Sequence, residues 1–153
     1  MFNLDKVSPT RYVIFNRERG FARHVSNYDE LFKELSIKYP NVTFEKGITY
    51  NRVIESIKYF NQIKMLVGVH GSQFSNVIFM QPNTYYIEIQ MESEKFLMMR
   101  IAVFTGKKVI LVKDGNIKYR EIVDNLVNTK VVIEGIDYAF SDIASGDKFF
   151  SFG

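Results

Sequence analysis

The sequence predicts an α/β fold in which a doubly wound, mainly parallel, Rossmann-like sheet carries helices on both faces. Short apolar segments rich in β-formers alternate with segments of helical character, and the connections between them are short. In residues 65–80 an apolar run meets Gly-His-Gly-Ser, and a second apolar segment follows. This order is typical of a buried parallel strand that leads into a helix. With 153 residues, 46% of them apolar, we expect a single domain over residues 1–153.

The first part of the chain predicts two strands and a helix. Residues 11–16 are rich in β-formers and predict the first strand. After an arginine-rich loop, Asn27 is suited to be a helix N-cap, with Glu30 at the third helical position. Pro40 ends this helix, because the residue before a proline is disfavoured in helical geometry. A short second strand is expected over residues 42–45.

The rest of the chain continues the alternation. We expect a helix over residues 51–62, a strand over 65–69, a short helix from Ser72, a strand over 85–89, a helix over 94–105 and a strand over 108–112. Gly106 stands where a C-cap glycine belongs. Beyond these elements we expect a helix over residues 119–127 and a strand over residues 130–134.

Composition and missing motifs exclude several classes of function. The net charge of +3 permits an anionic ligand but does not amount to a nucleic-acid-binding surface. The chain has no cysteine and two histidines, so neither disulfides nor a zinc centre are expected. It contains no Walker loop, no Gly-x-Gly-x-x-Gly, no Gly-x-Ser-x-Gly and no Asp-x-Asp. No signal segment and no run of ~18 apolar residues is present, so we expect a soluble polypeptide as given, with its compartment open.

Residues suited to bind a nucleotide follow three of the expected strands. They are Arg17 and Arg23 after the first strand, His70, Gly71 and Ser72 after the third, and Glu88 near the end of the fourth. The carboxyl ends of parallel strands share one edge of the sheet, where ligands bind in open α/β folds. Guanidinium groups pair with diphosphate oxygens, a glycine lets backbone approach a ligand, and a helix start attracts negative charge. A carboxylate is the usual acceptor for two ribose hydroxyls.

The same residues also have structural interpretations. Arg17, Arg19 and Arg23 are equally consistent with a solvated loop face. His70 fits a core histidine bonded to a backbone carbonyl. Glu88 fits a buried residue paired with an arginine, since a buried carboxylate without a partner is costly. The residues alone leave these alternatives open.

Several of these segments occur together in a known family. The segments are Arg17, Arg23-His24-Val25-Ser26-Asn27, Glu30-Leu31, Val67-Gly68-Val69-His70-Gly71-Ser72, Asn76-Val77-Ile78-Phe79-Met80, Pro82 and Ile87-Glu88-Ile89. In order and spacing, this pattern resembles the carboxyl-terminal half of family-61 glycosyltransferases over residues 11–106.

The resemblance implies one half of a two-domain, GT-B-type enzyme that binds a nucleotide-sugar donor, usually a UDP-sugar. Transfer would invert the anomeric centre without a bound metal or other cofactor. Carried over by position, Arg17 and Arg23 would address the diphosphate, His70, Gly71 and Ser72 would form the phosphate-side turn, Asn76 would hold the helix or the ligand, and Glu88 would contact ribose. The catalytic residues stay unassigned.

The chain departs from the family pattern in a few places. Gln73 stands where glycine is frequent, which narrows the room for backbone approach, while the hydroxyl of Ser72 partly compensates. Asn83 replaces a frequent turn glycine and is tolerated because asparagine accepts left-handed geometry. The amino-terminal, acceptor-binding half, which commonly supplies the general base, is not recognised in this sequence.

Three hypotheses follow. In the first, the chain is the donor-binding domain of an inverting hexosyl- or pentosyltransferase, which alone binds UDP or a UDP-sugar and transfers sugar slowly or not at all. In the second, it is a non-catalytic binding or interaction module that retains the fold, and the face left by the missing domain is apolar or self-associated in a homo-oligomer. In the third, it is a generic flavodoxin-like domain with unrelated ligands. The sugar, the linkage and the acceptor, a glycan or a protein, are not determined by the sequence.

Overall fold

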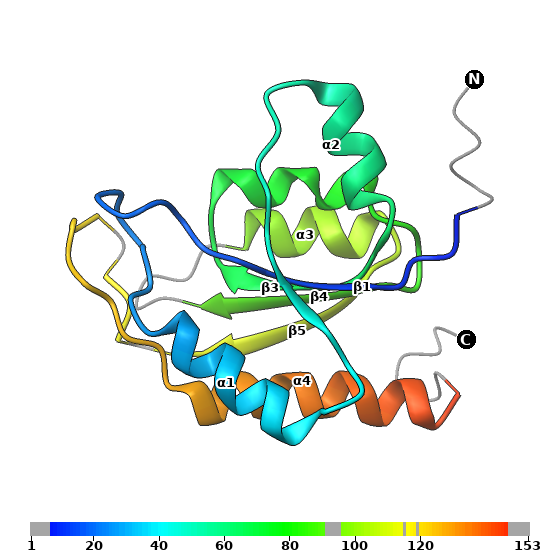
Figure 1. Ribbon diagram of the computed structural model, residues 1–153. Coiled ribbons are helices and arrows are strands. Elements are labelled where there is room, and N and C mark those ends of the chain that lie inside the picture. The colour runs from blue at the N-terminus through cyan, green and yellow to red at the C-terminus, as the bar shows by residue number, and fades with distance from the viewer. Residues whose placement is uncertain (1–6, 91–95, 115, 119, 147–153) are drawn as a thin grey trace.

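A computed structural model describes residues 7–90, 96–114, 116–118 and 120–146. Its centre is a five-stranded sheet in the order β2-β1-β3-β4-β5, and every neighbouring pair is parallel. The strands are β1 (Arg11–Phe15), β2 (Phe44–Lys46), β3 (Ile63–Val69), β4 (Tyr85–Gln90) and β5 (Lys108–Lys113). They lie within a few residues of the five strands expected up to residue 112. The α/β class and the parallel, Rossmann-like sheet are thereby confirmed (Figure 1).

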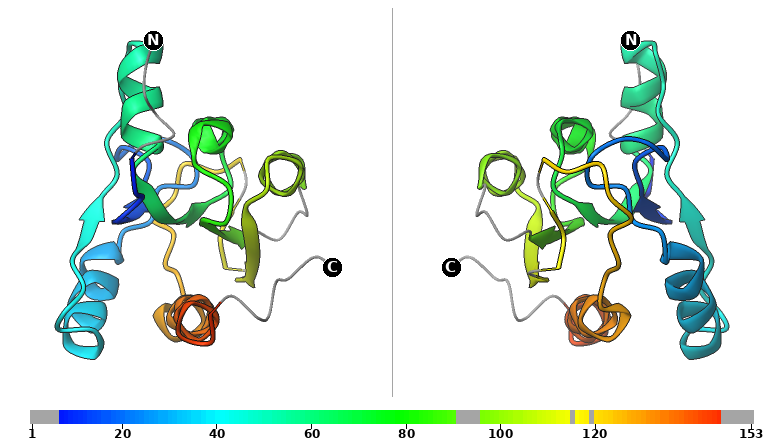
Figure 2. Two further views of the ribbon diagram at one scale, coloured as in Figure 1. Left: turned by 90° about the vertical axis from the view of Figure 1, so that its right-hand side faces the viewer. Right: turned by 90° about the vertical axis from the view of Figure 1, so that its left-hand side faces the viewer.

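Helices cover both faces of the sheet, as Figure 2 shows end-on. They are α1 (Tyr28–Lys38), α2 (Val53–Phe60), the 3₁₀ helix η2 (Ser72–Phe79), α3 (Leu97–Phe104) and α4 (Thr129–Ala144). Apolar side chains of α1 and α4 pack on one face, and those of α2, η2 and α3 pack on the other. The central strands β3 and β4 are buried on both faces, which explains why β3 is a nearly continuous apolar run.

The chain order reverses between β1 and β3. After β1 the chain passes through α1 to β2 on one side, and β3 then returns to the other side of β1. The connections that leave β1 and β3 therefore diverge to opposite faces of the sheet, because α1 and η2 belong to different apolar clusters. Open α/β sheets bind ligands at such a switch point, at the edge where the strands end. We call this edge the carboxyl edge.

Two turns have the backbone geometry that the sequence predicts. Gly106 follows α3 with φ of +75°, its N–H donates to the carbonyl of Val103, and the N–H of Lys107 donates to the carbonyl of Ala102. This pair of bonds is a Schellman motif, so the expected C-cap glycine is confirmed. Asn83 has φ of +61°, the left-handed geometry that asparagine tolerates.

The expectations after residue 118 are wrong. Residues 120–128 contain no helix, and the expected strand over residues 130–134 lies inside α4. Val132, Ile136 and Ala139 are buried at helical spacing against the sheet, so tertiary packing outweighs the strand propensity of the local run. A Cβ on Gly135 would lie 2.6 Å from Cγ2 of Val112, so this glycine lets α4 approach β5 closely.

The short helix after β3 forms, but it is a 3₁₀ helix. Phe74 and Val77 are its buried residues, and Met80, directly after it, is buried too. Burial therefore recurs every third residue, as expected for three residues per turn.

Gly68 of β3 is required by the packing on two sides. A Cβ there would lie 2.5 Å from Cζ of Phe74 and 2.8 Å from the carbonyl oxygen of Phe15. We expect Gly68→Ala to lower the free energy of unfolding by about 1–3 kcal/mol, measured by denaturant titration. Adding Phe74→Leu should restore only part of the loss, because the contact with the Phe15 carbonyl persists. A fully stable single variant would contradict this packing.

Candidate functional site

The loop after β1 and the turn after β3 meet at the switch point. Nη1 of Arg23 donates a hydrogen bond to the carbonyl oxygen of His70 over 2.9 Å. A Cβ on Gly71 would lie 2.7 Å from Nη2 of Arg17, so the guanidinium group packs directly against this glycine. The structure thus brings Arg17, Arg23, His70 and Gly71 together. The extended backbone of Gly71, with φ of −176°, is open to any residue, so glycine is needed here to seat Arg17.

Asn16 holds the arginine-rich loop in this position. Its Nδ2 donates to the carbonyl of Val25 over 2.7 Å, and its Oδ1 accepts from the backbone N–H of Val25 and of Arg17. Both ends of the loop are therefore tied to a single side chain. Within the loop, Nδ1 of His24 lies 2.7 Å from the carbonyl oxygen of Arg17. Arg23 has φ of +70°, and such strain is typical of residues that a fold holds in place for function.

Two further asparagines attach the loop to the segment before α4. Asn27 was expected to cap α1 with its side chain, but it makes no such capping bond. Its amide instead exchanges two 3.0 Å hydrogen bonds with the backbone of Val127. Asn125 pairs with Val25 in an isolated parallel bridge, and its side chain donates to the carbonyl of His24. The loop is fixed by contacts between residues about a hundred positions apart.

Glu88 lies beside the turn but is fully buried, with 0% of its surface exposed. Oε1 lies 2.7 Å from Nδ1 of His70 and accepts from Nε2 of Gln90 over 2.6 Å, while Oε2 accepts from the hydroxyl of Tyr86 over 2.6 Å. Burial, and secondarily the charge of Glu88, raise the pKa of Tyr86 well above its usual value, which keeps it a neutral donor. Both carboxylate oxygens thus have partners inside the protein, and the expected contact of Glu88 with ribose stays a prediction.

The remaining expected residues lie on η2. Ser72 is exposed at its start. Asn76 is half-buried, and its Nδ2 donates to the carbonyl of Gln73 over 3.1 Å, which supports the helix itself. This bond fits the role of holding the helix, and a contact of Asn76 with the ligand stays a prediction.

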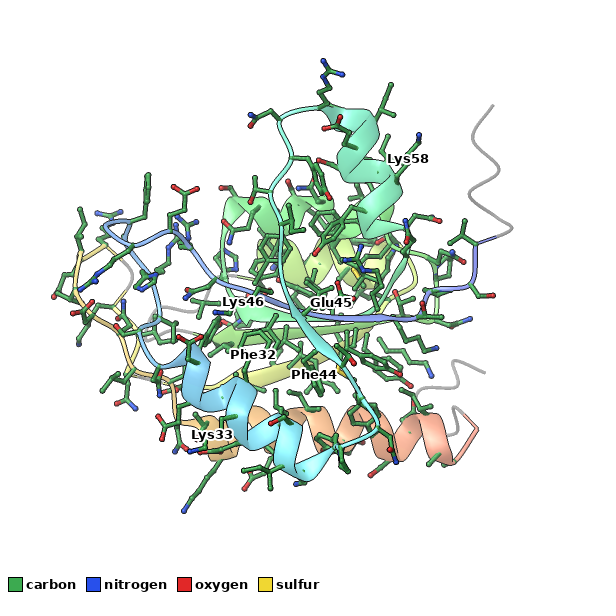
Figure 3. The ribbon with its side chains drawn as sticks, viewed as in Figure 1. Phe32, Lys33, Phe44, Glu45, Lys46 and Lys58 are labelled. Carbon is green, nitrogen blue, oxygen red and sulfur yellow. The ribbon has the colours of Figure 1, made fainter. Side chains whose placement is uncertain are left out.

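A polar cavity of about 320 Å³ opens at the carboxyl ends of β1 and β2. We call it the β1–β2 cavity. Its polar lining includes Asn16, Ser26 and Asp29, with the rings of Tyr28 and Phe32 from α1. Figure 3 shows Phe32 on α1 and Lys46 at the end of β2, the two elements that flank this cavity. Nζ of Lys46 lies 2.7 Å from Oδ1 of Asp29, which forms an exposed ion pair at the rim.

Sequence reasoning missed several residues of this site. Tyr86 and Gln90 flank Glu88 at intervals of two on one strand, so the period of a strand could have placed them on the same face as Glu88. Asn16 was assigned to the first strand and lies just beyond it. No local signal marks Asn125, whose partner in the arginine-rich loop, His24, is distant in sequence.

A family model of glycosyltransferase 61 matches residues 1–87 of the chain. The chain belongs to this family. Its class of activity is therefore glycosyl transfer. The matched range contains every expected site residue except Glu88, which follows directly after it. A search of curated proteins finds none that matches this family-61 chain.

In the part of this family-61 chain that the structure describes, no helix is both long and apolar enough to cross a bilayer. Within the same residues, no three His, Asp or Glu side chains are grouped so that they could hold a metal ion. Metal-independent transfer and a GT-B-type second domain stay predictions.

We call the set of hydrogen bonds by which Asn16 ties the two ends of the loop the Asn16 clamp. It can be tested by removing the only donor group of the Asn16 side chain. In Asn16→Asp the side chain still accepts from Val25 and Arg17, but an oxygen then faces the carbonyl of Val25. We expect a loss of about 1–3 kcal/mol in the free energy of unfolding and faster hydrogen exchange at the Val25 amide. Asn76→Asp is the matched control, since it breaks one bond within η2 and should leave the loop unchanged. Equal exchange at Val25 in both variants would contradict the clamp.

Proposed function

We propose that the carboxyl edge binds the nucleoside diphosphate of a sugar donor, in keeping with a UDP-sugar as substrate. The observation that carries this proposal is the convergence of Arg17, Arg23 and His70 around Gly71, directly before η2 and at the switch point of the sheet. Guanidinium groups and a helix start are the groups that proteins use to bind phosphate. Ser72 adds an exposed hydroxyl at the same place.

The same groups suit the chemistry of an inverting transfer. The bond between the anomeric carbon and the phosphate oxygen breaks, and its electron pair stays on the departing diphosphate. An acceptor hydroxyl attacks from the opposite side and gives its proton to a base, which these residues do not identify. Positive groups fixed around the diphosphate stabilise the charge that develops there and need no metal to do so.

The nucleoside of the donor would occupy the β1–β2 cavity. Its volume of about 320 Å³ and its mixture of aromatic and polar lining suit a small planar ligand. Asn16 lines this cavity and is adjacent in sequence to Arg17, so a single ligand can span the cavity and the turn.

Titration with nucleotides tests the proposal. We expect UDP and UDP-sugars to raise the melting temperature of the protein, and FMN and NAD to have no effect. Arg17→Ala should weaken UDP binding roughly tenfold or more in calorimetry, because it removes a charged hydrogen-bond donor of the diphosphate. Lys58→Ala is the control, since this exposed cation lies in the last turn of α2 (Figure 3), away from the carboxyl edge.

Two results would count against the proposal. One is an equal loss of affinity in both variants, which would indicate general electrostatic attraction. The other is a response to FMN or NAD in place of UDP, which would favour a flavodoxin-like ligand.

A second candidate function is an interaction module that self-associates at this edge. Phe21, Ile122 and Leu126 are 57%, 71% and 58% exposed, and loops that include Phe21 and Ile122 flank a shallow groove of about 470 Å³. These loops lie side by side beyond the ends of the strands (Figure 1). Exposed apolar groups grouped in this way are typical of a surface that another protein covers.

Self-association at the groove can be measured directly. If the protein self-associates at this groove, the wild type sediments as a dimer. Ile122→Asp then sediments as a monomer, because it would bury a charge in the interface between the two copies. Ile37→Asp, an equally exposed position on α1, is the control and should leave the mass unchanged. A monomeric wild type would exclude self-association at this groove.

A further inference from the structure

Glu88 has more hydrogen-bond partners than a turn that only binds phosphate would require. The carboxylate of Glu88 is fully buried. It lies on the face of the sheet that η2 and α3 cover, because Tyr86, on the same face of β4, packs in the apolar cluster that these helices form. It accepts from three donors, which are Tyr86, Gln90 and His70. A buried carboxylate is costly unless hydrogen bonds and an opposite charge compensate it. Of these three donors, His70 is the one that can carry a positive charge.

The imidazole of His70 connects Glu88 to the turn. Nδ1 lies 2.7 Å from Oε1 of Glu88, and the side chain is 9% exposed. Among the described residues Nε2 has no hydrogen-bond partner. Arg23 binds the carbonyl of the same residue, and Arg17 packs on the next one. Glu88 therefore holds the ring of His70 at Nδ1, and Arg23 holds the backbone of the same residue.

We propose that Glu88 is a positioning residue: it fixes His70 with Nδ1–H turned inward, so that Nε2–H donates a hydrogen bond to a phosphate oxygen of the donor. The inference rests on the proposed function for its ligand. It replaces a direct contact between Glu88 and ribose by an indirect action through the imidazole.

The chemistry of the ring makes this arrangement specific for an anion. When Nδ1 donates to Glu88, a neutral ring has a bare acceptor at Nε2, which would repel a phosphate oxygen. The Glu88 carboxylate at Nδ1 and a phosphate oxygen at Nε2 are both acceptors, and a ring in which both nitrogens donate satisfies the two together. A carboxylate that orients a histidine through its second nitrogen is a general device of active and metal sites.

Calorimetry with three probes separates this action from a ribose contact. Pyrophosphate carries only the charged part of the donor, uridine only the nucleoside, and UDP both. Glu88→Gln keeps the shape and an acceptor for Nδ1 but removes the charge. We expect it to weaken pyrophosphate and UDP by the same factor, roughly tenfold, and to leave uridine unchanged. Loss of uridine binding with pyrophosphate unaffected would overturn the inference and restore the ribose contact.

A double-mutant cycle tests whether Glu88 acts through His70. In His70→Gln the amide places a neutral donor near the position of Nε2, and Glu88→Gln should then have no further effect on pyrophosphate affinity. Additive losses would overturn the inference, since Glu88 would then act independently of the ring. Asp142→Asn is the matched control, because Asp142 is also 0% exposed and bonded to a cation, Lys108, but at the opposite edge. Equal effects of Asp142→Asn and Glu88→Gln on pyrophosphate affinity would overturn the inference, since Glu88 would then contribute only to the stability of the fold.

A spectroscopic readout covers the case in which Glu88→Gln does not fold. Nitrogen-15 spectra of the wild-type His70 ring should show both nitrogens protonated in the pyrophosphate complex, and a bare Nε2 there would overturn the inference. Wild-type protein that binds pyrophosphate but not UDP would overturn the proposed function alone. Binding of UDP with no effect of Glu88→Gln would overturn this inference alone, and binding of neither probe would remove both.

Discussion

The parallel pairing of β1 with β3 is the constraint on which the site depends. Phe15 pairs with Gly68, so the residues just beyond both strands emerge next to each other at the carboxyl edge. The connections then leave toward opposite faces, and the guanidinium group of Arg17 packs against Gly71 where they diverge. Gly68 and Gly71 follow from this closeness, the first to admit Phe74 and the second to admit a guanidinium group. The order of strands thus determines where a ligand can bind and which positions must lack a side chain.

Buried charge is distributed to the two ends of the sheet. At the carboxyl edge, Glu88 is surrounded by donors and bonded to His70. At the opposite edge, Asp142 of α4 accepts from Lys108 over 2.7 Å and from the hydroxyl of Tyr85 over 2.6 Å. The second pair joins α4 to the first residues of β4 and β5. The first pair leaves one nitrogen of its histidine for a ligand, and this difference suits one pair to structure and the other to binding.

In the loop that carries the arginines, hydrogen bonds from side-chain amides take the place of those of regular secondary structure. The loop over residues 16–25 has no regular pairing of its own beyond the bridge of Val25 to Asn125. Asn16 and Asn125 bond backbone groups of this loop, and Asn27, two residues after it, bonds the backbone of Val127 in the segment before α4. A loop held in this way presents Arg17 and Arg23 in a fixed geometry, which would lower the entropy cost of binding the proposed donor.

The sequence by itself determined the class of fold, the five sheet strands to within a few residues, and the placement of Arg17, Arg23 and His70 at the carboxyl edge. These features follow from local periodicity, from turn residues such as Gly106 and Asn83, and from the rule that parallel strands end together. Only the tertiary structure decided that residues 130–134 form helix, that Asn27 bonds Val127, and that Glu88 faces His70. Each of these depends on a partner far away in the chain, and local pattern carries a residue's periodicity but not the identity of what packs against it.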